Sequence, residues 1–435
     1  MNLILNNLRI VSPFSEQEYI ETGHIAIEDG IITDISSQFI PALKDGESID
    51  MKGKTVLPGL INAHSHLYSS LALGMPSPQR QPKNFVQILE EIWWKLDVGL
   101  DENSAKASFE SGLLDCLLNG CTTIVDHHAS PKYVEGSLDL LVETAENFGV
   151  NIGVCFECSD RNGEENFKAE VAENVRTLEK YQDSPNVAPL FGLHASFTLS
   201  DRSLEEIAGI MEKHPKWGIH IHVAEDFADQ QDATDRGYES VIQRLDSYKL
   251  LNQQSHIVHG IHMTSRDVRI LEAKGCSLIH NPTSNANNQV GILPSDVING
   301  LGAGLGTDGM QNNMLTEMKE GVLIRSASTE HAVDYPRLLF ENNPAIVSKM
   351  FHQNLGRIEV GAQADLVFYD YDSRTEIKKN NILSHILFGF DKPTDVMTQG
   401  KFRVQNGAAL TINIPEVQEQ AVNQSRELWK AMQKL

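Results

Sequence analysis

The sequence predicts an α/β protein, a (β/α)₈ TIM-like barrel with a small β-sandwich domain formed from both chain ends. The chain has 435 residues, 41% of them hydrophobic, which is enough for a large core. Its middle alternates short apolar runs with amphipathic helical patterns, whereas its ends carry strand patterns. We expect the β-sandwich domain from residues 1–56 and 358–410, the barrel from 57–357 and a C-terminal helix from 411–435.

The predicted β-sandwich domain depends on strand patterns at both ends. Short strand-like runs separated by turns lie at Leu3–Ser12, His24–Ile27, Ile31–Ile35 and Lys52–Val56. A matching pattern returns at Ala364–Tyr369 and Val396–Val404, and the hairpin pair Asn406-Gly407 follows it. The two ends are therefore expected to pair, leaving the region between them as one insertion.

The predicted barrel depends on eight strand-like runs, with helical patterns such as Ser104–Leu118 and Ser203–Lys213 between them. Eight such units fit a closed parallel barrel, in which catalytic groups gather where the strands end. The polar run Asn281–Asn288 follows the seventh strand and is expected to be a loop at this functional rim. The strands are Val56–His66, Cys121–His128, Asn151–Cys158, Val187–Phe197, Trp217–Glu225, His256–Met263, Cys276–Ser284 and Gly302–Gly309.

The amino-acid composition limits the classes of partner that we expect and the cellular location. The formal net charge is −23, from 59 acidic and 36 basic residues, so we expect no nucleic acid and no anionic membrane surface as partner. There is no apolar run of about 18 residues, and the start lacks an export signal, so we expect a cytoplasmic protein. Five cysteines fit reduced thiols, and the pair Cys155 and Cys158 lies in an apolar run typical of a core.

Histidines are concentrated at the predicted strand ends. The carboxyl ends of parallel barrel strands converge on one mouth, so imidazoles from separate strands can surround one cation. Nine of the 16 histidines lie at or near these ends: His64, His66, His127, His128, His194, His222, His259, His262 and His280.

Four residues at the strand ends, three of these histidines and one aspartate, predict a metal site. His64 and His66 are two residues apart on one strand and point to the same face. His222 ends the fifth strand, with His220 expected one layer below it, and Asp308 ends the eighth. Three imidazoles and one carboxylate leave an open position, which is typical of a catalytic metal site. We expect one divalent ion, Zn²⁺, with Fe²⁺ or Mn²⁺ as alternatives, whose bound water has a pKa of about 7.

Two further residues are expected to act on protons and charge. Glu225 lies three residues after His222, where a carboxylate can exchange a proton with a substrate nitrogen. His259 precedes a turn glycine and is expected to stabilise charge on the attacked carbon. Asp308, besides binding the ion, is expected to accept a proton from its water.

A third set is predicted to bind substrate. His194 lies at the end of the fourth strand, and His128, Glu157 and Arg161 follow the second and third strands. A hydrogen-bond network at the rim is the alternative for these residues. The separate roles of His127 and His128 stay open. The segment around Trp93-Trp94 is amphipathic. Three interpretations stay open for it: packing into the core, covering the pocket, or contact with another subunit.

The ordered set PGLINAHSH, His194, HVAE, HG and GTDG resembles the amidohydrolase superfamily, in its chlorohydrolase and cytosine-deaminase-like branch. The resemblance spans essentially the whole chain. Segments 126–131, 156–163, 220–226 and 285–291 are similar to the aminohydrolases called SsnA. The resemblance implies a homo-oligomer, metal ligation by His64, His66, His222 and Asp308, and roles for Glu225 and His259 in proton transfer and electrophilic assistance. Two-metal members use a strand-four lysine where this chain has His194, which implies one metal.

The expected function is hydrolysis of carbon–nitrogen bonds other than peptide bonds. The leading hypothesis is deamination of an amino-substituted N-heterocycle, such as a purine, pyrimidine or pterin, by attack of metal-bound hydroxide. One alternative is hydrolytic opening of a cyclic amide or amidine. The other is a barrel that binds a ligand without turnover, against which Glu225 and Asp308 argue.

Overall fold

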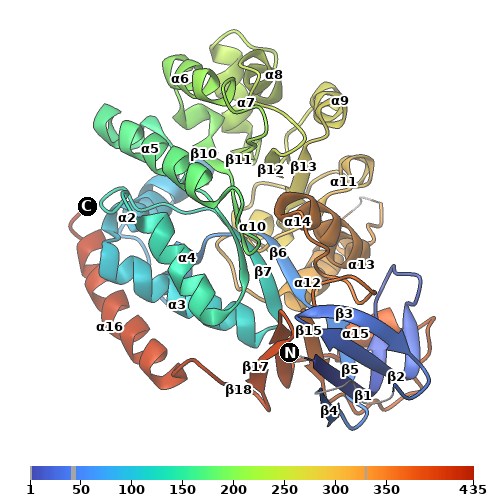
Figure 1. The fold of residues 1–435 in the computed structure, drawn as a ribbon. Helices are drawn as coiled ribbons and strands as arrows, with labels where there is room; N and C mark the ends of the chain where they lie inside the picture. Colours follow the sequence, from blue (N-terminus) through green and yellow to red (C-terminus); the bar gives the residue numbers. More distant parts are fainter. Residues whose placement is uncertain (1, 41–45, 329–330) are drawn as a thin grey trace.

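The computed structural model describes residues 2–40, 46–328 and 331–435 (Figure 1). Residues 1 and 41–45 of the predicted β-sandwich domain, and 329–330 of the predicted barrel, lie outside the described residues. The described strands form one mixed sheet of nine strands and two parallel sheets of five and four strands. In the part of the chain that is described, no helix has the length and apolar composition needed to cross a membrane.

The mixed sheet is built from both ends of the chain, as predicted. Its strands are β1 (Asn2–Val11), β2 (Tyr19–Glu28), β3 (Ile31–Ser36), β4 (Glu47–Asp50), β5 (Thr55–Pro58), β15 (Leu366–Tyr369), β16 (Asp395–Thr398), β17 (Lys401–Gln405) and β18 (Ala408–Ala409). The order is β18-β17-β16-β15-β5-β1-β2-β3, with β4 beside β1. The antiparallel pair β5–β15 joins the two ends, with Val56 opposite Phe368. Leu5, Ile27 and Phe368 belong to one buried core under this sheet.

The two parallel sheets carry the middle of the chain. One has the order β6-β7-β8-β9 and the other β10-β11-β12-β13-β14. Their residues are almost all buried, as expected for strands covered on both faces. The strands are β6 (Leu60–Ser65), β7 (Cys121–Asp126), β8 (Asn151–Val154), β9 (Val187–Pro189), β10 (Phe191–Ala195), β11 (Ile219–Val223), β12 (His256–His259), β13 (Ser277–His280) and β14 (Gly304–Leu305).

Backbone contacts join the two parallel sheets at both edges. A parallel bridge pairs Cys158, beyond β8, with Leu193 on β10. At the other edge, a parallel bridge pairs Ser65 with Asp308, and the backbone N–H groups of Thr307 and Asp308 donate to the carbonyl oxygen of His64 at 3.0 Å each. The first and last strands are therefore neighbours, and the chain has a TIM-barrel-like α/β fold.

Helices surround these strands (Figure 1). Between strands lie α1 (Phe85–Ile88), α2 (Trp94–Gly99), α3 (Glu102–Leu118), α4 (Ser137–Phe148), α5 (Glu164–Tyr181), α6 (Asp201–Met211), α7 (Phe227–Asp235), α8 (Val241–Ser247), α9 (Ser265–Lys274), α10 (Pro282–Asn287) and α11 (Ser295–Leu301). After β14 come α12 (Met314–Ser326), α13 (Tyr335–Arg337), α14 (Asn343–Phe351), α15 (Ile382–Gly389) and α16 (Ile414–Met432). The predicted terminal helix is α16, which packs on α3 and α2.

Short turns of 3₁₀ and π helix complete the secondary structure. The 3₁₀ turns are Leu67–Ala72, Asp160–Asn162 and Ser196–Thr198, and the π turns are Leu89–Trp93 and Leu338–Asn342. The first π turn joins α1 to α2 in the Trp93-Trp94 segment. Asp101 and Ser104 form a capping box at the start of α3.

Three sequence predictions are corrected. The run Val187–Phe197 is not one strand, because it is interrupted at Leu190 and divides into β9, in the four-stranded sheet, and β10, in the five-stranded sheet. The run Val56–His66 is not one strand, because the N–H of Gly59 donates to the carbonyl oxygen of Asp365 and divides it into β5, in the mixed sheet, and β6. The run Asn281–Asn288 is not a loop. It forms α10, since Pro282 occupies the first turn, where its fixed φ favours a helix, and buried Glu317 accepts the N–H of Thr283.

Candidate metal centre and active site

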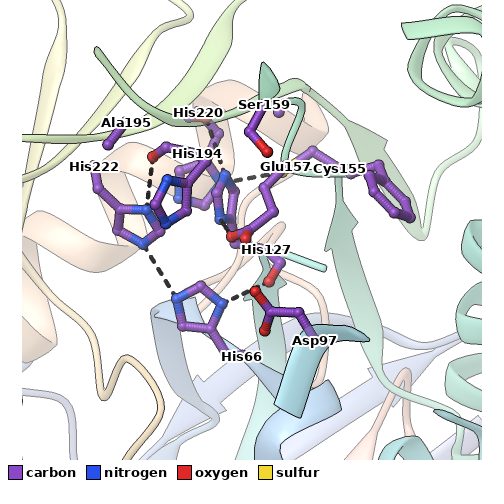
Figure 2. A network of polar contacts seen from close by, with 12 residues as sticks. His66, Asp97, His127, Cys155, Glu157, Ser159, His194, Ala195, His220 and His222 are labelled. Atoms are coloured by element: carbon purple, nitrogen blue, oxygen red, sulfur yellow. Dashed lines mark hydrogen bonds and ion pairs between the residues drawn. The ribbon is translucent and has the colours of Figure 1, made fainter. Parts of the chain in front are cut away.

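The four predicted metal ligands lie together at the carboxyl ends of three strands. His64 and His66 come from the end of β6, His222 from β11, and Asp308 lies just after β14. One nitrogen or oxygen of each lies within 4.8 Å of the others. Figure 2 shows His66 and His222 facing one another, with His127, Glu157 and His194 beside them.

The donor atoms have the spacing of ligands around one divalent ion. Nε2 of His222 lies 3.1 Å from Nε2 of His66 and 3.3 Å from Nε2 of His64. Oδ1 of Asp308 lies 2.9 Å from Nε2 of His66 and 3.4 Å from Nε2 of His64. Ligands with bonds of about 2.0–2.1 Å lie about 2.9 Å apart at right angles and about 3.3 Å apart at tetrahedral angles, so these distances are compatible with an open position for water. The residues present therefore fit a divalent ion.

The hydrogen bonds of the ligands also fit a cation. Nδ1 of His66 donates to the carbonyl oxygen of His127 at 2.6 Å, and Nδ1 of His222 donates to that of His194 at 2.8 Å. Because a carbonyl oxygen only accepts, each neutral ring keeps its lone pair on Nε2. Lone pairs that converge in this way repel one another unless a positive charge lies between them.

Asp308 supplies the negative charge of this cluster. Burial, the largest single effect, lowers the pKa of His66, but the hydrogen bond to Asp308 and the negative charges of Asp308, Glu157 and Asp126 together raise that pKa to about 9. Burial would raise the pKa of Asp308, yet hydrogen bonds from His64 and His66 hold it well below its usual range. The hydroxyl of Ser284 on α10 donates to the other oxygen of Asp308. The site thus stabilises positive charge beside an ionised carboxylate.

Glu225, predicted to transfer protons, and His259, predicted to stabilise charge, lie next to each other. Oε2 of Glu225 lies 3.4 Å from Nε2 of His259, and Oε1 accepts from Asn288 at 3.1 Å. Burial raises the pKa of Glu225 above that of an exposed glutamate. Nδ1 of His259 lies 2.8 Å from Oδ1 of Asn285, while its buried Nε2 has no hydrogen-bond partner among the described residues. Nε2 is therefore free to meet a reacting group.

A cleft opens above these residues. His66, His222, Glu225 and Asp308 line it, which makes that part of its wall polar. The remaining wall is largely aromatic and apolar, from Tyr68, Phe85, Leu89, Trp93, Trp94, Phe197 and Met310. Such a cleft can hold a flat ring between apolar side chains with its reactive edge toward the cluster.

The predicted substrate-binding residues divide into two groups. Glu157 and His194 line the cleft, whereas His128 and Arg161 are not among its described lining residues. The ring of His128 is fully buried against Phe109 and hydrogen-bonds Ser130 at 2.7 Å. The ring of His128 also contacts Tyr68, which lines the cleft, and a role for His128 in substrate binding stays a prediction.

Arg161 acts behind the cleft wall. Its guanidinium donates to Glu157 at 2.9 Å and to Asp97 at 3.1 Å. Nδ1 of His127 lies 3.2 Å from the other oxygen of Glu157, and the carbonyl of His127 accepts from His66. The structure thus places Arg161 and His127 in contact with residues at the cleft rather than at its surface.

Sequence reasoning missed the roles of Ser284, Asn285, Asn288 and Asp229. The first three lie on or just after α10 and contact Asp308, His259 and Glu225. Asp229 accepts from the N–H of Ala224, which directly precedes Glu225. The run of asparagines after a strand was the available signal, but a helix of six residues is too short for its periodicity to be recognised.

Comparisons with known proteins concern the fold and the family of this chain. A 5-methylthioadenosine/S-adenosylhomocysteine deaminase from Bacillus cereus (strain AH820) is 28% identical over 423 residues, covering 94% of this chain and 95% of its own. An adenosine deaminase from Xanthomonas campestris with bound zinc has a TM-score of 0.83 at 19% identity, covering 98% of both chains.

A second solved structure, atrazine chlorohydrolase from Arthrobacter aurescens TC1 complexed with zinc, has a TM-score of 0.80 at 18% identity. It covers 97% of this chain and 100% of its own. These likenesses support the fold. The model of the amidohydrolase family matches residues 55–403, which include all four predicted ligands. This chain belongs to the amidohydrolase family.

Proposed function

We propose that this protein is a metal-dependent aminohydrolase that deaminates an amino-substituted N-heterocycle. The observation that carries the proposal is the convergence of three imidazole Nε2 atoms and one carboxylate beside a buried pair, Glu225 and His259. A structural metal site needs no neighbouring acid, whereas a hydrolase needs one to move protons. The names of the deaminase relatives support the same reaction class.

The proposal assigns the ligands and the ion. His64, His66, His222 and Asp308 bind one Zn²⁺, since imidazole and carboxylate suit zinc and the two solved relatives contain it. Fe²⁺ and Mn²⁺ are the alternatives. When bound, such an ion lowers the pKa of a water to about 7 and so supplies a nucleophile at neutral pH.

The proposal also assigns the architecture around the site. Residues 57–357 form a closed (β/α)₈ barrel, supported by the backbone contacts between Ser65 and Asp308 and between Cys158 and Leu193. Residues 1–56 and 358–410 form the β-sandwich domain, supported by the β5–β15 pair, and 411–435 form the terminal helix. Homo-oligomerisation and a cytoplasmic location stay predictions.

This chain's side chains move the protons. Asp308, held ionised by its histidine neighbours, accepts a proton from the attacking water. Glu225, whose pKa is raised by burial, protonates a ring nitrogen next to the attacked carbon. His259 faces the same point through Nε2 and stabilises the charge that develops on the substrate. Asp308 then gives its proton to the leaving amino group, Glu225 takes the proton of the added hydroxyl, and collapse of the tetrahedral carbon expels ammonia.

The cleft favours a small planar substrate. Trp93, Trp94 and Phe197 offer aromatic faces to a heterocycle, and its polar edge meets Glu157 and His194. The apolar part of the cleft leaves room for a substituent, as in the nucleoside-type substrates that the names of the relatives indicate.

The reaction class is tested with zinc-loaded protein and a panel of aminopurines, their nucleosides, aminopyrimidines and pterins. We expect ammonia in a one-to-one ratio with product, and a product in which OH replaces NH₂ by mass spectrometry. Ring opening would instead add one water to the substrate without releasing ammonia. A panel that yields neither ammonia nor any deaminated product rejects the proposal.

The role of Glu225 is tested by Glu225→Gln. Removing the acid is expected to lower kcat by about 10²- to 10⁴-fold, while zinc content stays unchanged because Glu225 is outside the ligand set. Glu205→Gln, an exposed site on α6, is the matched control and should retain full activity. Equal kcat values for Glu225→Gln and the wild type would show that another group moves the proton.

A further inference from the structure

A second layer of buried polar side chains lies beneath His64. His220 is on β11, two residues before His222, and its side chain is fully buried. Its Nε2 lies 2.9 Å from Nδ1 of His64, and its Nδ1 lies 3.6 Å from Sγ of Cys155. Sγ of Cys155 is also 3.6 Å from the carbonyl oxygen of Asp126. These contacts form one chain from the metal cluster into the core.

His64 differs from the other two histidines of the cluster. Backbone carbonyl oxygens hold Nδ1 of His66 and of His222, so those rings can only donate there. Nδ1 of His64 faces another imidazole, which can either donate or accept. The tautomer of His64, and with it the lone pair on Nε2, therefore depends on which nitrogen of His220 carries the proton.

The series of contacts determines which nitrogen of His220 carries the proton. The carbonyl of Asp126 only accepts, so the thiol of Cys155 donates to it and the sulfur accepts from Nδ1–H of His220. Nε2 of His220 then has a lone pair and accepts Nδ1–H of His64. This leaves the Nε2 lone pair of His64 directed at the cluster, as metal binding requires. In this series of contacts from Asp126 to His64, each donor has one acceptor.

We propose that His220 and Cys155 are positioning residues that hold His64 in its metal-binding tautomer. Second-layer partners of metal-binding histidines are ordinarily carboxylates, carbonyls or water. Here an imidazole and a thiol take that place. The inference rests on the proposed function, because it needs His64 to be a metal ligand.

A rival reading treats the second layer as a metal site of its own. Ligand atoms of His127, Cys155 and His220 lie within 4.8 Å of one another. A cation on Nδ1 of His220 would leave that neutral ring protonated on Nε2, 2.9 Å from the Nδ1–H of a metal-bound His64. Two donors would then face each other, so neutral rings cannot serve both sites at once. The contacts favour the positioning role.

The test measures zinc affinity by competition with a chromophoric chelator. His220→Leu, which removes the acceptor, is expected to weaken zinc binding by about 10- to 100-fold. His220→Gln restores most of the affinity, because its amide oxygen can accept from His64. Cys155→Ala should weaken binding several-fold and Cys155→Ser less. The control is His256→Leu, which should leave zinc affinity unchanged. His256 lies on β12, and its buried ring contacts that of His220.

The outcomes separate this inference from the proposed function. If the wild-type protein has no tight zinc site, both the positioning role and the proposed function are rejected. Tight wild-type binding with equal affinities for His220→Leu and His220→Gln would reject only the positioning role. Thermal unfolding of the metal-free variants shows whether each is folded, and Cys155→Ala keeps the test valid if the His220 variants are not.

Cobalt substitution tests the rival reading. We expect one Co²⁺ per chain and no thiolate-to-cobalt charge-transfer band, since the four proposed ligands include no sulfur. A second equivalent of cobalt with such a band, lost in Cys155→Ser, would overturn the proposal in favour of a deep metal site.

Discussion

At the residue scale, three positions at the site have left-handed backbone without being glycine. They are Ala224 (φ 47°), His259 (φ 70°) and Asp308 (φ 56°), each where a strand ends. This conformation costs about 1–2 kcal/mol for a residue with a side chain. Hydrogen bonds maintain it: the N–H of Ala224 donates to Asp229, and that of Asp308 donates to the carbonyl of His64. The turns direct the carboxylates of Glu225 and Asp308 toward one point.

Asp229 provides the residue-scale prediction. Its two oxygens accept the N–H groups of Ala224 and Phe197 at 2.8 and 3.1 Å. Asp229→Ala leaves both N–H groups without an acceptor and should lower the unfolding free energy by about 1–3 kcal/mol for each. It should also lower kcat, because Glu225 follows Ala224. Asp229→Asn keeps one acceptor and should lie between wild type and Asp229→Ala in denaturant titrations and kinetics.

The matched control for Asp229 is Asp235→Ala, an exposed position on the same helix, α7. It should change neither unfolding free energy nor kcat. If Asp229→Ala destabilised the fold without any loss of kcat, Asp229 would support the helix and not the position of Glu225.

At the element scale, the site depends on the close approach of β14 to β6. A Cβ on Gly306 would lie 2.8 Å from both the backbone N and O of His64. Gly306→Ala must therefore push the two strands apart and displace Asp308, two residues later. We expect lower thermal stability and weaker zinc binding.

Gly300→Ala is the control for this substitution, because a Cβ there meets no atom within 4 Å. That change lies in α11 and should be neutral or slightly stabilising, since alanine favours a helix. Equal zinc affinities for the two variants would show that the contact between β14 and β6 does not set the geometry of the site.

Helix α10 is held by a buried acid. Glu317 on α12 accepts the N–H of Thr283 at 3.0 Å, and burial raises its pKa to about 8. An acid with a raised folded pKa contributes stability below its unfolded pKa of about 4.3, and this is lost as pH rises through about 8. Glu317→Gln cannot ionise, so its unfolding free energy should exceed the wild-type value by a margin that grows between pH 5 and 8.

Urea titrations of both proteins at pH 5, 6.5 and 8 measure that margin. A margin on the order of a few kcal/mol at pH 8 is expected from the size of the shift. Parallel pH profiles would mean that Glu317 is already ionised in the folded protein.

At the scale of the whole molecule, the proposed metal ties together strands from both parallel sheets. His64 and His66 lie at the end of β6, whereas His222 lies on β11 and Asp308 follows β14. An ion bound to all four links His66 to His222, 156 residues later, and to Asp308 beyond it, so it should stabilise the fold as well as the reaction. At 100 times Kd, a ligand adds about 2.7 kcal/mol.

Removing the metal tests whether the bound ion stabilises the fold. Chelation should lower Tm, and added zinc should restore it in the wild type. Asp308→Asn, which loses the carboxylate, should show little response to zinc. A wild-type Tm that is the same with and without zinc would contradict a tight site among these four residues.

Most of the site chemistry was predictable because its residue types follow short strands at regular intervals. The strand ends placed His64, His66, His222 and Asp308 at one mouth without any knowledge of their contacts. The direction of His128 was not predictable, because its ring turns toward Phe109, which is close only in space. The helix α10 was missed because Glu317, 34 residues away, supplies part of its N-terminal hydrogen bonding.

The sequence by itself determined the alternation of strands and helices, the pairing of the two ends and the set of groups at the strand ends, because these follow from local patterns and spacing. Only the tertiary structure decided which of those groups face the cleft, which lie behind it, and how His220 and Cys155 meet His64. The physical reason is that orientation, tautomer and pKa depend on neighbours brought together by folding, which no local pattern encodes.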